Sequence, residues 1–354
     1  MICCNHFCVP RLRRLHPSTP ASTTGIASTL LAVGMLALAV ATPGVSAKAA
    51  GAEPWITTWA ATPAPRWAEE LPAPFNVPEV LGDQTVRQIA RISVGGDQLR
   101  VVISNEFGTR PVTIGSATVA LSAGGSAIDP ATVKPLTFGG QSSAIIPPGA
   151  PLVSDPVDLS VKPLSSVAVS FYLPKRTGIA SVHWDGVQTG YISGPGDKTK
   201  DADFKADSTS KSRLLLSRIL TTAKPDSTAI VFFGDSITDG NCSTPDANNR
   251  WPDHIAERLQ AEGHPDVAVV NEAYSGDRVL TNGMGTNALS RFDMSVLSHP
   301  HVSTVVMMMG ISSSTSTRLS RTRRTQTTST LPMIVATTCI RTTRDIRPWR
   351  RPSI

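Results

Sequence analysis

The stretch that decides the fold runs from residue 229 to residue 240 and reads Ala229-Ile230-Val231-Phe232-Phe233-Gly234-Asp235-Ser236-Ile237-Thr238-Asp239-Gly240. Its first five residues are all apolar, which is typical of a strand in a parallel sheet that is covered on both faces. The strand ends at the Gly234-Asp235-Ser236 turn, and a helix-like segment follows from Trp251 to Gly263. Open α/β sheets hold ligands at the carboxyl ends of their strands, so Ser236 is expected at the functional edge of a sheet.

The following segments continue this alternation of strand and helix. Residues 251–262 carry apolar side chains at helical spacing, and residues 286–297 are also helix-like. Val267–Val270 and Val302–Met309 are predicted as the second and third strands. The order strand, helix, strand, helix, strand is a βαβαβ unit, so an α/β domain is predicted over residues 229–311.

The preceding residues, 51–193, are rich in strand signals. Val86–Val94 is followed by the turn Gly95-Gly96-Asp97 and by Leu99–Ser104, which predicts a hairpin. Similar short runs occur at Val112–Leu121, Ala144–Pro147, Leu152–Leu159, Val167–Leu173 and Ala180–Trp184. Gly and Pro separate these runs at intervals of about ten residues, which predicts an antiparallel β-sandwich or jelly-roll module.

Residues 194–228 connect the two predicted domains. The polar and charged residues 194–212 predict a linker or a long surface loop, and Arg213–Leu220 predicts one connecting strand.

The first 50 residues have the pattern of an export signal. Arg11, Arg13 and Arg14 precede an apolar segment from Gly25 to Ala41, and Val45-Ser46-Ala47 is a cleavage-like site. The apolar part is short for a membrane span and is followed by Pro43-Gly44. We therefore expect a cleaved signal peptide, a secreted or periplasmic product and no stable membrane anchor.

The net charge of +6 is concentrated at the two ends of the chain. Residues 311–354 carry nine Arg and the single Asp345, whereas residues 50–310 are mildly acidic. A basic stripe for nucleic acid is therefore not expected in the folded part. Only Cys242 and Cys339 would remain after signal cleavage, which excludes a disulfide framework, and no Cys/His spacing predicts a zinc site. We expect neither a metal nor a cofactor.

The pattern breaks after Ile311. Residues 312–354 are mostly Ser, Thr and Arg, with no Gly, no Lys and no His. One interpretation is a disordered basic tail, which would bind polyanions in a strongly salt-dependent way. The other, which we favour because the break falls inside a fold, is a reading frame that shifts near residue 311.

Ester hydrolysis requires a nucleophile, a base, a group that orients the base and donors for the oxyanion. Gly234-Asp235-Ser236 can supply the first of these, although it does not fit the G-x-S-x-G elbow, because Thr238 replaces the second Gly. Alone the triplet is also compatible with a tight turn and a capping serine.

Its context resembles the GDSL, or SGNH, hydrolase family. Phe233–Gly240 with Asn249-Arg250-Trp251-Pro252 is similar to the first block of that family, and Asn271–Asp277 to the second. Upstream, Trp55–Ala61 and Ile103–Thr109 resemble the β-rich module of a secreted bacterial subgroup whose members resemble carbohydrate acyl esterases. This resemblance covers residues 229–311 and part of the β-rich module.

The resemblance implies a flavodoxin-like three-layer α/β fold and acyl transfer through a serine ester. It assigns Ser236 as the nucleophile and the backbone N–H groups of Ser236 and Gly276 to the oxyanion hole. Gly234, Asp235 and Asp239 would shape the turn. A small acyl ester or an acylated polysaccharide would be the substrate.

Two of the family's blocks are missing. The third block reads roughly G-x-N-D, but here Gly310-Ile311 is followed by Ser312-Ser313. The D-x-x-H block, which holds the orienting Asp and the basic His, has no counterpart, so no catalytic His or Asp is found. His299 and His301 precede the third strand and are expected at the opposite, amino edge of the sheet, while His254 is expected on a helix surface.

Two functions follow. The first is a secreted, GDSL-type, lipase-like serine esterase, with carbohydrate deacetylation as a candidate reaction, in a truncated domain with impaired activity. The alternative is a non-catalytic secreted glycan-binding protein. In that case Trp55, Trp59 and Trp67 of the β-rich module are candidate sugar platforms, although core positions are an equal interpretation.

Overall fold

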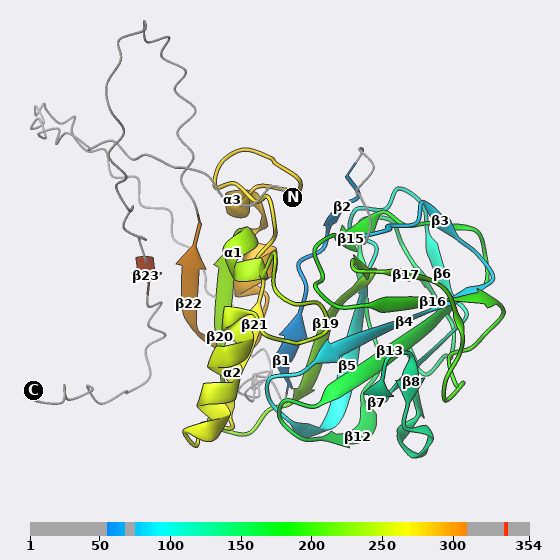
Figure 1. Cartoon of the computed structure of the whole chain (residues 1–354), viewed down its shortest axis with the longest axis horizontal. Helices are drawn as coiled ribbons and strands as arrows, with labels where there is room; N and C mark the ends of the chain where they lie inside the picture. The colour runs from blue at the N-terminus through cyan, green and yellow to red at the C-terminus, as the bar shows by residue number, and fades with distance from the viewer. Residues whose placement is uncertain (1–54, 68–74, 310–335, 339–354) are drawn as a thin grey trace, which may run out of the picture. The chain divides into compact units, whose positions relative to one another are not determined.

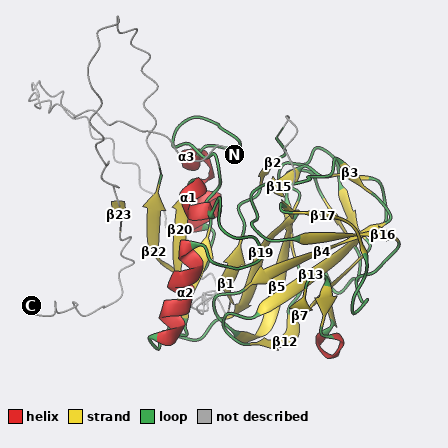
Figure 2. Ribbon diagram, viewed as in Figure 1, coloured by secondary structure: helices red, strands yellow, loops and turns green. Residues whose placement is uncertain are grey.

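The computed structural model of the chain describes residues 55–67, 75–309 and 336–338. They form a strand-rich module that ends at Thr222 and a smaller α/β part that begins at Thr228 (Figures 1 and 2). The predicted signal peptide, the frame change near residue 311 and nearly all of the basic tail lie outside the described residues. No helix of the described ranges is long and apolar enough to span a membrane.

One sheet of the β-rich module has five strands and is antiparallel throughout. Its order is β1, β19, β5 and β11, and β12 also pairs with β5. The strands are β1 (Trp55–Ala60), β5 (Gly96–Ser104), β11 (Pro151–Val153), β12 (Val157–Val161) and β19 (Leu216–Thr222).

The second sheet has seven antiparallel strands in the order β17, β16, β4, β13, β7 and β8, and β9 also pairs with β7. They are β4 (Gln84–Arg91), β7 (Ser116–Gly124), β8 (Ala127–Ile128), β9 (Lys134–Pro135), β13 (Ser166–Leu173), β16 (Gly190–Pro195) and β17 (Ala206–Ser210).

Short strands complete the module. β2 (Ala64–Pro65), β15 (Ser181–His183) and β18 (Arg213–Leu214) form a three-stranded sheet. The two remaining pairs are β3 (Val80–Leu81) with β14 (Thr177–Gly178), and β6 (Val112–Ile114) with β10 (Ala144–Ile146). A 3-10 turn, η1, covers Pro130–Thr132.

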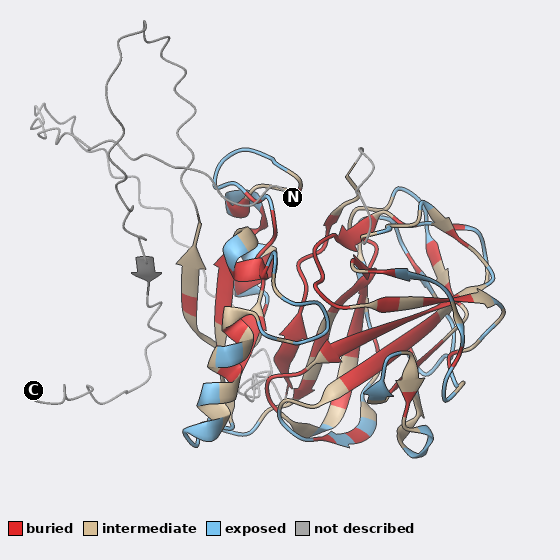
Figure 3. Cartoon of the chain, in the orientation of Figure 1, coloured by how far each residue is buried: buried red, intermediate tan, exposed pale blue. Residues whose placement is uncertain are grey.

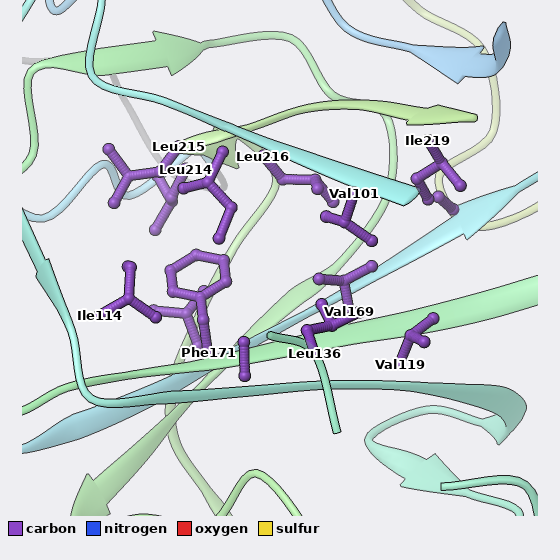
Figure 4. Close-up of a cluster of buried hydrophobic side chains, with 14 of the residues drawn as sticks. Val101, Ile114, Val119, Leu136, Val169, Phe171, Leu214, Leu215, Leu216 and Ile219 are labelled. Carbon is purple, nitrogen blue, oxygen red and sulfur yellow. The ribbon is translucent and has the colours of Figure 1, made fainter. Parts of the chain in front are cut away.

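Apolar side chains from both large sheets form one hydrophobic core. Val101 and Ile219 of the five-stranded sheet share this cluster with Val119, Val169 and Phe171 of the seven-stranded sheet (Figure 4). Figure 3 shows that the long strands of both sheets are buried over most of their length. The two antiparallel sheets agree with the prediction of an antiparallel β-rich module.

The predicted hairpin of residues 86–104 is wrong. β4 lies in the seven-stranded sheet and β5 in the five-stranded sheet, so the chain crosses from one sheet to the other. Gly95 is required at this crossing, because a Cβ atom there would lie 2.3 Å from the backbone oxygen of Val161. The Gly-rich sequence therefore permits a close backbone approach and not a two-residue hairpin turn.

The predicted linker of residues 194–228 is in large part an integral piece of the module. It contributes β17, β18 and β19, and β19 pairs with both β1 and β5. The guanidinium of Arg87 donates hydrogen bonds to the carbonyl oxygens of Lys198, Thr199 and Asp201, at 3.3, 3.3 and 2.8 Å. Residues 194–212 are polar because they form the edge strand β17 and a loop whose carbonyl oxygens are hydrogen bonded to Arg87.

The α/β part has a four-stranded sheet in the order β21, β20, β22 and β23. β20 (Thr228–Gly234) pairs in parallel with β21 (Val267–Asn271) and β22 (Val302–Met308), which confirms the three predicted strands. β23 (Ala336–Thr338) pairs antiparallel with β22. The helical elements are α1 (Ser236–Asp239), α2 (Trp251–Ala261), α3 (Ala288–Phe292) and the π-helical turn η2 (Asp293–Leu297).

Each face of this sheet is covered by a different set of elements. Phe232 and Val269 pack against Ile255 and Leu259 of α2. On the other face, Val231 and Phe233 form a cluster with residues of α3, η2 and β1, namely Ala288, Val296, Ile56 and Ala60. β1 therefore pairs within the five-stranded sheet and also covers the α/β sheet.

Candidate active site

The turn after β20 presents Ser236 as the first residue of α1. Asp235 caps this short helix, since its carboxylate accepts a hydrogen bond from the backbone N–H of Ile237 at 3.1 Å. Gly234 has to be glycine, because a Cβ atom would lie 2.4 Å from the carbonyl oxygen of Met308 in β22. The motif thus forms a strand-to-helix turn at the carboxyl edge of the sheet, as the sequence predicts.

Ser236 is half-buried, and neither its hydroxyl nor its backbone N–H has a hydrogen-bond partner within the described residues. Its carbonyl oxygen accepts the N–H groups of Gly240 and Asn241, at 3.0 and 2.9 Å, which closes α1. The reactive side of the residue is therefore unengaged.

Gly276 lies in the loop that follows β21. It has a φ of 85°, a conformation that favours glycine, and its exposed backbone N–H has no acceptor among the described residues. The backbone N–H of Tyr274 donates to the carbonyl oxygen of Gly234 at 3.0 Å. This bond joins the loop to the Ser236 turn, so both predicted oxyanion donors belong to loops that are directly connected.

His183, His254 and His299 have hydrogen-bond partners other than Ser236. His254 is exposed on α2 and contacts Glu257 at 3.1 Å, as the sequence predicts, and His264 is exposed. His299 precedes β22, but its imidazole lies 2.8 Å from Glu272, the residue directly after β21.

Asp239, which sequence reasoning assigned to shaping the turn, is the centre of a buried polar cluster. One carboxylate oxygen accepts the backbone N–H of Ser275 at 2.7 Å, and the other lies 2.9 Å from Nε2 of His183. Burial by itself lowers the pKa of His183, but the charge and hydrogen bond of Asp239 outweigh it, so the pKa is raised above its usual value. His183 comes from β15, and no motif or spacing in the sequence links it to Asp239.

Asp185 contributes a second carboxylate to this cluster. It accepts hydrogen bonds from Asn241 Nδ2 at 2.6 Å and from Ser275 Oγ at 3.0 Å. Burial and the neighbouring charge of Asp239 raise the pKa of Asp185. Neither of these donors is a histidine, so Asp185 does not have the place of a carboxylate that orients a histidine base.

A third buried group supports the same loop from α3. Arg291 forms an ion pair with Asp277 and donates to the carbonyl oxygen of Glu272 at 2.7 Å. Its guanidinium also lies 4.2 Å from the ring centre of Phe233. Burial raises the pKa of Asp277, and Arg291 only partly offsets this effect. Arg291 was not identified from the sequence, in which it is one Arg in a helix-like segment.

The described residues contain no group of three or more His, Cys, Asp or Glu side chains that could hold a metal ion. A cavity of about 550 Å³ lies between the five-stranded sheet and η2. It is lined by Trp55, Arg100, Arg218 and His299, among others, and by neither Ser236 nor Gly276. This cavity is thus separate from the predicted catalytic residues.

The model of the GDSL-like Lipase/Acylhydrolase family matches residues 232–338. This GDSL-like region contains both the Ser236 turn and the Gly276 loop. It extends beyond residue 311, where the resemblance read from the sequence ends. A search of curated proteins found no match.

Two solved structures are distantly similar. One is an active site mutant of a family two carbohydrate esterase from Clostridium thermocellum, with 12% identity and a TM-score of 0.18; the match covers 66% of this chain and 57% of that one. The other is a salicylyl-acyltransferase from a tetracycline biosynthetic pathway, with 12% identity and a TM-score of 0.13. This match covers 55% of the present chain and 39% of the acyltransferase. The chain thus spans little more than half of the first protein, and scores this low carry no argument about fold or function.

Proposed function

We propose that this protein is a serine esterase of the GDSL type in which Ser236 attacks the carbonyl carbon of an acyl ester. The observation that carries the proposal is the Ser236 turn within the GDSL-like region, since the hydroxyl and N–H of Ser236 form no hydrogen bond to another described residue. Attack would form an acyl-serine ester and release the alcohol, and water would then hydrolyse that ester to regenerate the hydroxyl.

The backbone N–H groups of Ser236 and Gly276 would stabilise the oxyanion that develops on the ester carbonyl. Such donors act best when they are held in place before the reaction, because no reorganisation is then needed. The bond between Tyr274 and Gly234 supports this assignment by tying the two loops together.

Turnover by this chain is expected to be slow. A missing triad base commonly costs several powers of ten in rate, and a missing oxyanion donor costs about 2.7–4 kcal/mol. His183, His254 and His299 are engaged with the carboxylates of Asp239, Glu257 and Glu272. Gly310 and Ile311, where the third block begins, lie outside the described residues.

The finer structural and biological assignments belong to the same proposal. The α2 helix on one face of the sheet, and α3 with η2 on the other, support a truncated flavodoxin-like three-layer fold. The export-like sequence of residues 1–50 supports a secreted or periplasmic enzyme. An acylated carbohydrate is the proposed substrate, with the acyl group small.

The glycan-binding alternative loses two of its three candidate platforms. Trp55 and Trp59 are only 8% and 9% exposed, and Trp59 belongs to the core of the β-rich module. Trp67 is half-buried and remains available.

The test is the hydrolysis of p-nitrophenyl acetate by the purified 354-residue chain, with Ser236→Ala and with Ser208→Ala as a matched control. Ser208 is exposed on β17, away from the GDSL-like region. We expect slow release of p-nitrophenol that disappears in Ser236→Ala and persists in Ser208→Ala. Hydrolysis that survives Ser236→Ala would refute the role of Ser236. Fast hydrolysis that depends on Ser236 would show that a base is present after all.

A further inference from the structure

Ser275, the residue directly before Gly276, has all of its polar groups held by other residues. Its N–H donates to Asp239 at 2.7 Å, and its hydroxyl donates to Asp185 at 3.0 Å. Its carbonyl oxygen accepts the indole N–H of Trp184 at 2.9 Å. Ser275 has only 1% of its surface exposed, and its hydrogen bonds to Asp239, Asp185 and Trp184 fix its position.

Two of the partners of Ser275, Trp184 and Asp185, are consecutive residues of the β-rich module. The residue before them, His183, contacts the third partner, Asp239. His183, at the end of β15, contacts the second oxygen of Asp239 at 2.9 Å. Its other ring nitrogen lies 3.1 Å from the carbonyl oxygen of Thr62. We call His183, Trp184 and Asp185 the Ser275 clamp.

The members of the clamp are themselves well supported. All three are at least nine-tenths buried, and the ring of Trp184 packs edge-on against Phe75 with 4.8 Å between ring centres. Both nitrogens of His183 face atoms that can only accept, namely a carbonyl oxygen and a carboxylate oxygen. His183 therefore donates two hydrogen bonds and carries a positive charge, which balances the buried Asp239.

We propose that the Ser275 clamp consists of positioning residues, through which the β-rich module sets the place of the Gly276 N–H beside Ser236. This inference rests on the proposed function, because it assigns a role to the oxyanion loop of that esterase. It also makes the β-rich module a part of the active site. The GDSL-like region alone, residues 232–338, contains Ser275 and Asp239 but none of the clamp.

Amide hydrogen exchange of the full chain tests the clamp without requiring activity. Trp184→Phe removes the indole donor and keeps the aromatic contact, while Asp185→Ala removes the acceptor. Loss of one such buried hydrogen bond is expected to speed exchange of the protected amides between residues 272 and 277 about tenfold. Asp185→Asn keeps an acceptor oxygen and should retain the protection.

Thr118→Val is the matched control, because it removes a buried hydrogen bond of 2.8 Å, to the carbonyl oxygen of Thr199, inside the β-rich module. It should leave exchange of residues 272–277 unchanged. The proposal is overturned if Trp184→Phe and Asp185→Ala do not accelerate this segment, or if they accelerate β4 to the same extent. It is also overturned if Asp185→Asn behaves like Asp185→Ala.

Turnover gives the second readout. In Trp184→Phe, kcat for p-nitrophenyl acetate should fall at least about tenfold with little change in KM, because an oxyanion donor acts in the transition state. Faster exchange with an unchanged kcat would refute the link to Gly276. If the unaltered chain shows no turnover that depends on Ser236, the proposed function fails, whereas the exchange experiment still decides whether the clamp orders the loop.

Discussion

Two buried histidines, His183 and His299, each face a carboxylate, but they differ in charge. His183 donates to a carbonyl oxygen and to Asp239, so it is protonated. Burial lowers the pKa of His299 below its usual value, and Glu272 offsets this effect only in part, so His299 is neutral at pH 7. Glu272 remains ionised, because His299 and the positive charge of Arg218 outweigh the effect of burial and lower its pKa.

The two histidines should therefore change stability in opposite directions as the pH changes. A raised pKa in the folded state gives His183 a stabilising contribution that is complete below about pH 6.5 and is lost as the pH rises through the raised value. The lowered pKa of His299 gives a contribution that is complete above about pH 6.5 and is lost as the pH falls towards the lowered value.

Urea unfolding of His183→Gln and His299→Gln between about pH 5 and 9 measures this difference. Each substitution breaks buried hydrogen bonds and should cost about 1–3 kcal/mol. The cost of His183→Gln should be greater at pH 6 than at pH 9, and that of His299→Gln greater at pH 8 than at pH 5. Parallel pH trends for the two variants would contradict the assigned charge states.

Arg87 stabilises the loop of residues 196–204 in the β-rich module. It lies in β4, is fully buried, and donates to Ser170 Oγ at 2.8 Å and to four backbone carbonyl oxygens. Its guanidinium lies 4.6 Å from the ring centre of Phe204. Burial lowers its pKa to about 10, and the nearby charges of Asp201 and Asp203 limit the shift. The Arg87 guanidinium therefore holds three backbone carbonyl groups of the loop from Gly196 to Phe204.

Replacing Arg87 with Met should cost at least about 3 kcal/mol, because several buried carbonyl oxygens lose their donor. Thermolysin digestion should then cut between residues 196 and 205, whereas the unaltered chain should resist cleavage there. Lys205→Met, at an exposed position, serves as the control and should leave both stability and the cleavage pattern unchanged. Cleavage first at any other place would refute the idea that Arg87 holds this loop.

The elements that sequence reasoning recovered are those with a strong local signal. β20, β21 and β22 each contain an apolar run of at least four residues, and α2 has an apolar face with helical spacing. β17 was missed because its sequence is polar and three of its five residues are exposed, as suits a strand at the edge of a sheet. The hairpin was misjudged because a Gly-rich turn and a crossing between sheets look alike in sequence.

In the candidate site, too, only the residues with a local sequence signal could be predicted. Ser236 and Gly276 lie in motifs near each other in the chain, so a resemblance can find them. The clamp cannot be found in this way, because His183 of β15 and Asp239 of α1 are 56 residues apart and share no motif. Only the rule that a buried histidine needs partners indicates that His183 has some polar neighbour.

At the scale of the whole molecule, the β-rich module and the α/β part share β1. Ile56, which is 1% exposed, packs in the α/β core, while Trp59 of the same strand packs in the core of the β-rich module. The ion pair of Arg91 with Glu257 and the hydrogen bond of Thr62 to Glu272 join the same two parts. We therefore expect both parts to unfold together.

Ile56→Ala should destabilise both parts by about 2–5 kcal/mol in one transition, because it leaves a cavity in a shared core. Hydrogen exchange at increasing urea concentrations, followed separately for β4 and β20, measures this coupling. The two strands should lose protection at the same urea concentration, in the unaltered chain and in the variant. Continued protection of β4 after β20 has opened would show that the β-rich module is independent.

The pairing of β1 also determines when the protein can fold during synthesis. Its partner β19 is encoded about 160 residues later, and the sheet that β1 covers comes later still. At about 5–20 residues per second, a ribosome needs roughly 8–30 s to deliver β19 after β1 has been made. During that interval a strand with two tryptophans lacks the strand with which it pairs, so chaperones that capture nascent chains should bind preferentially to this stretch.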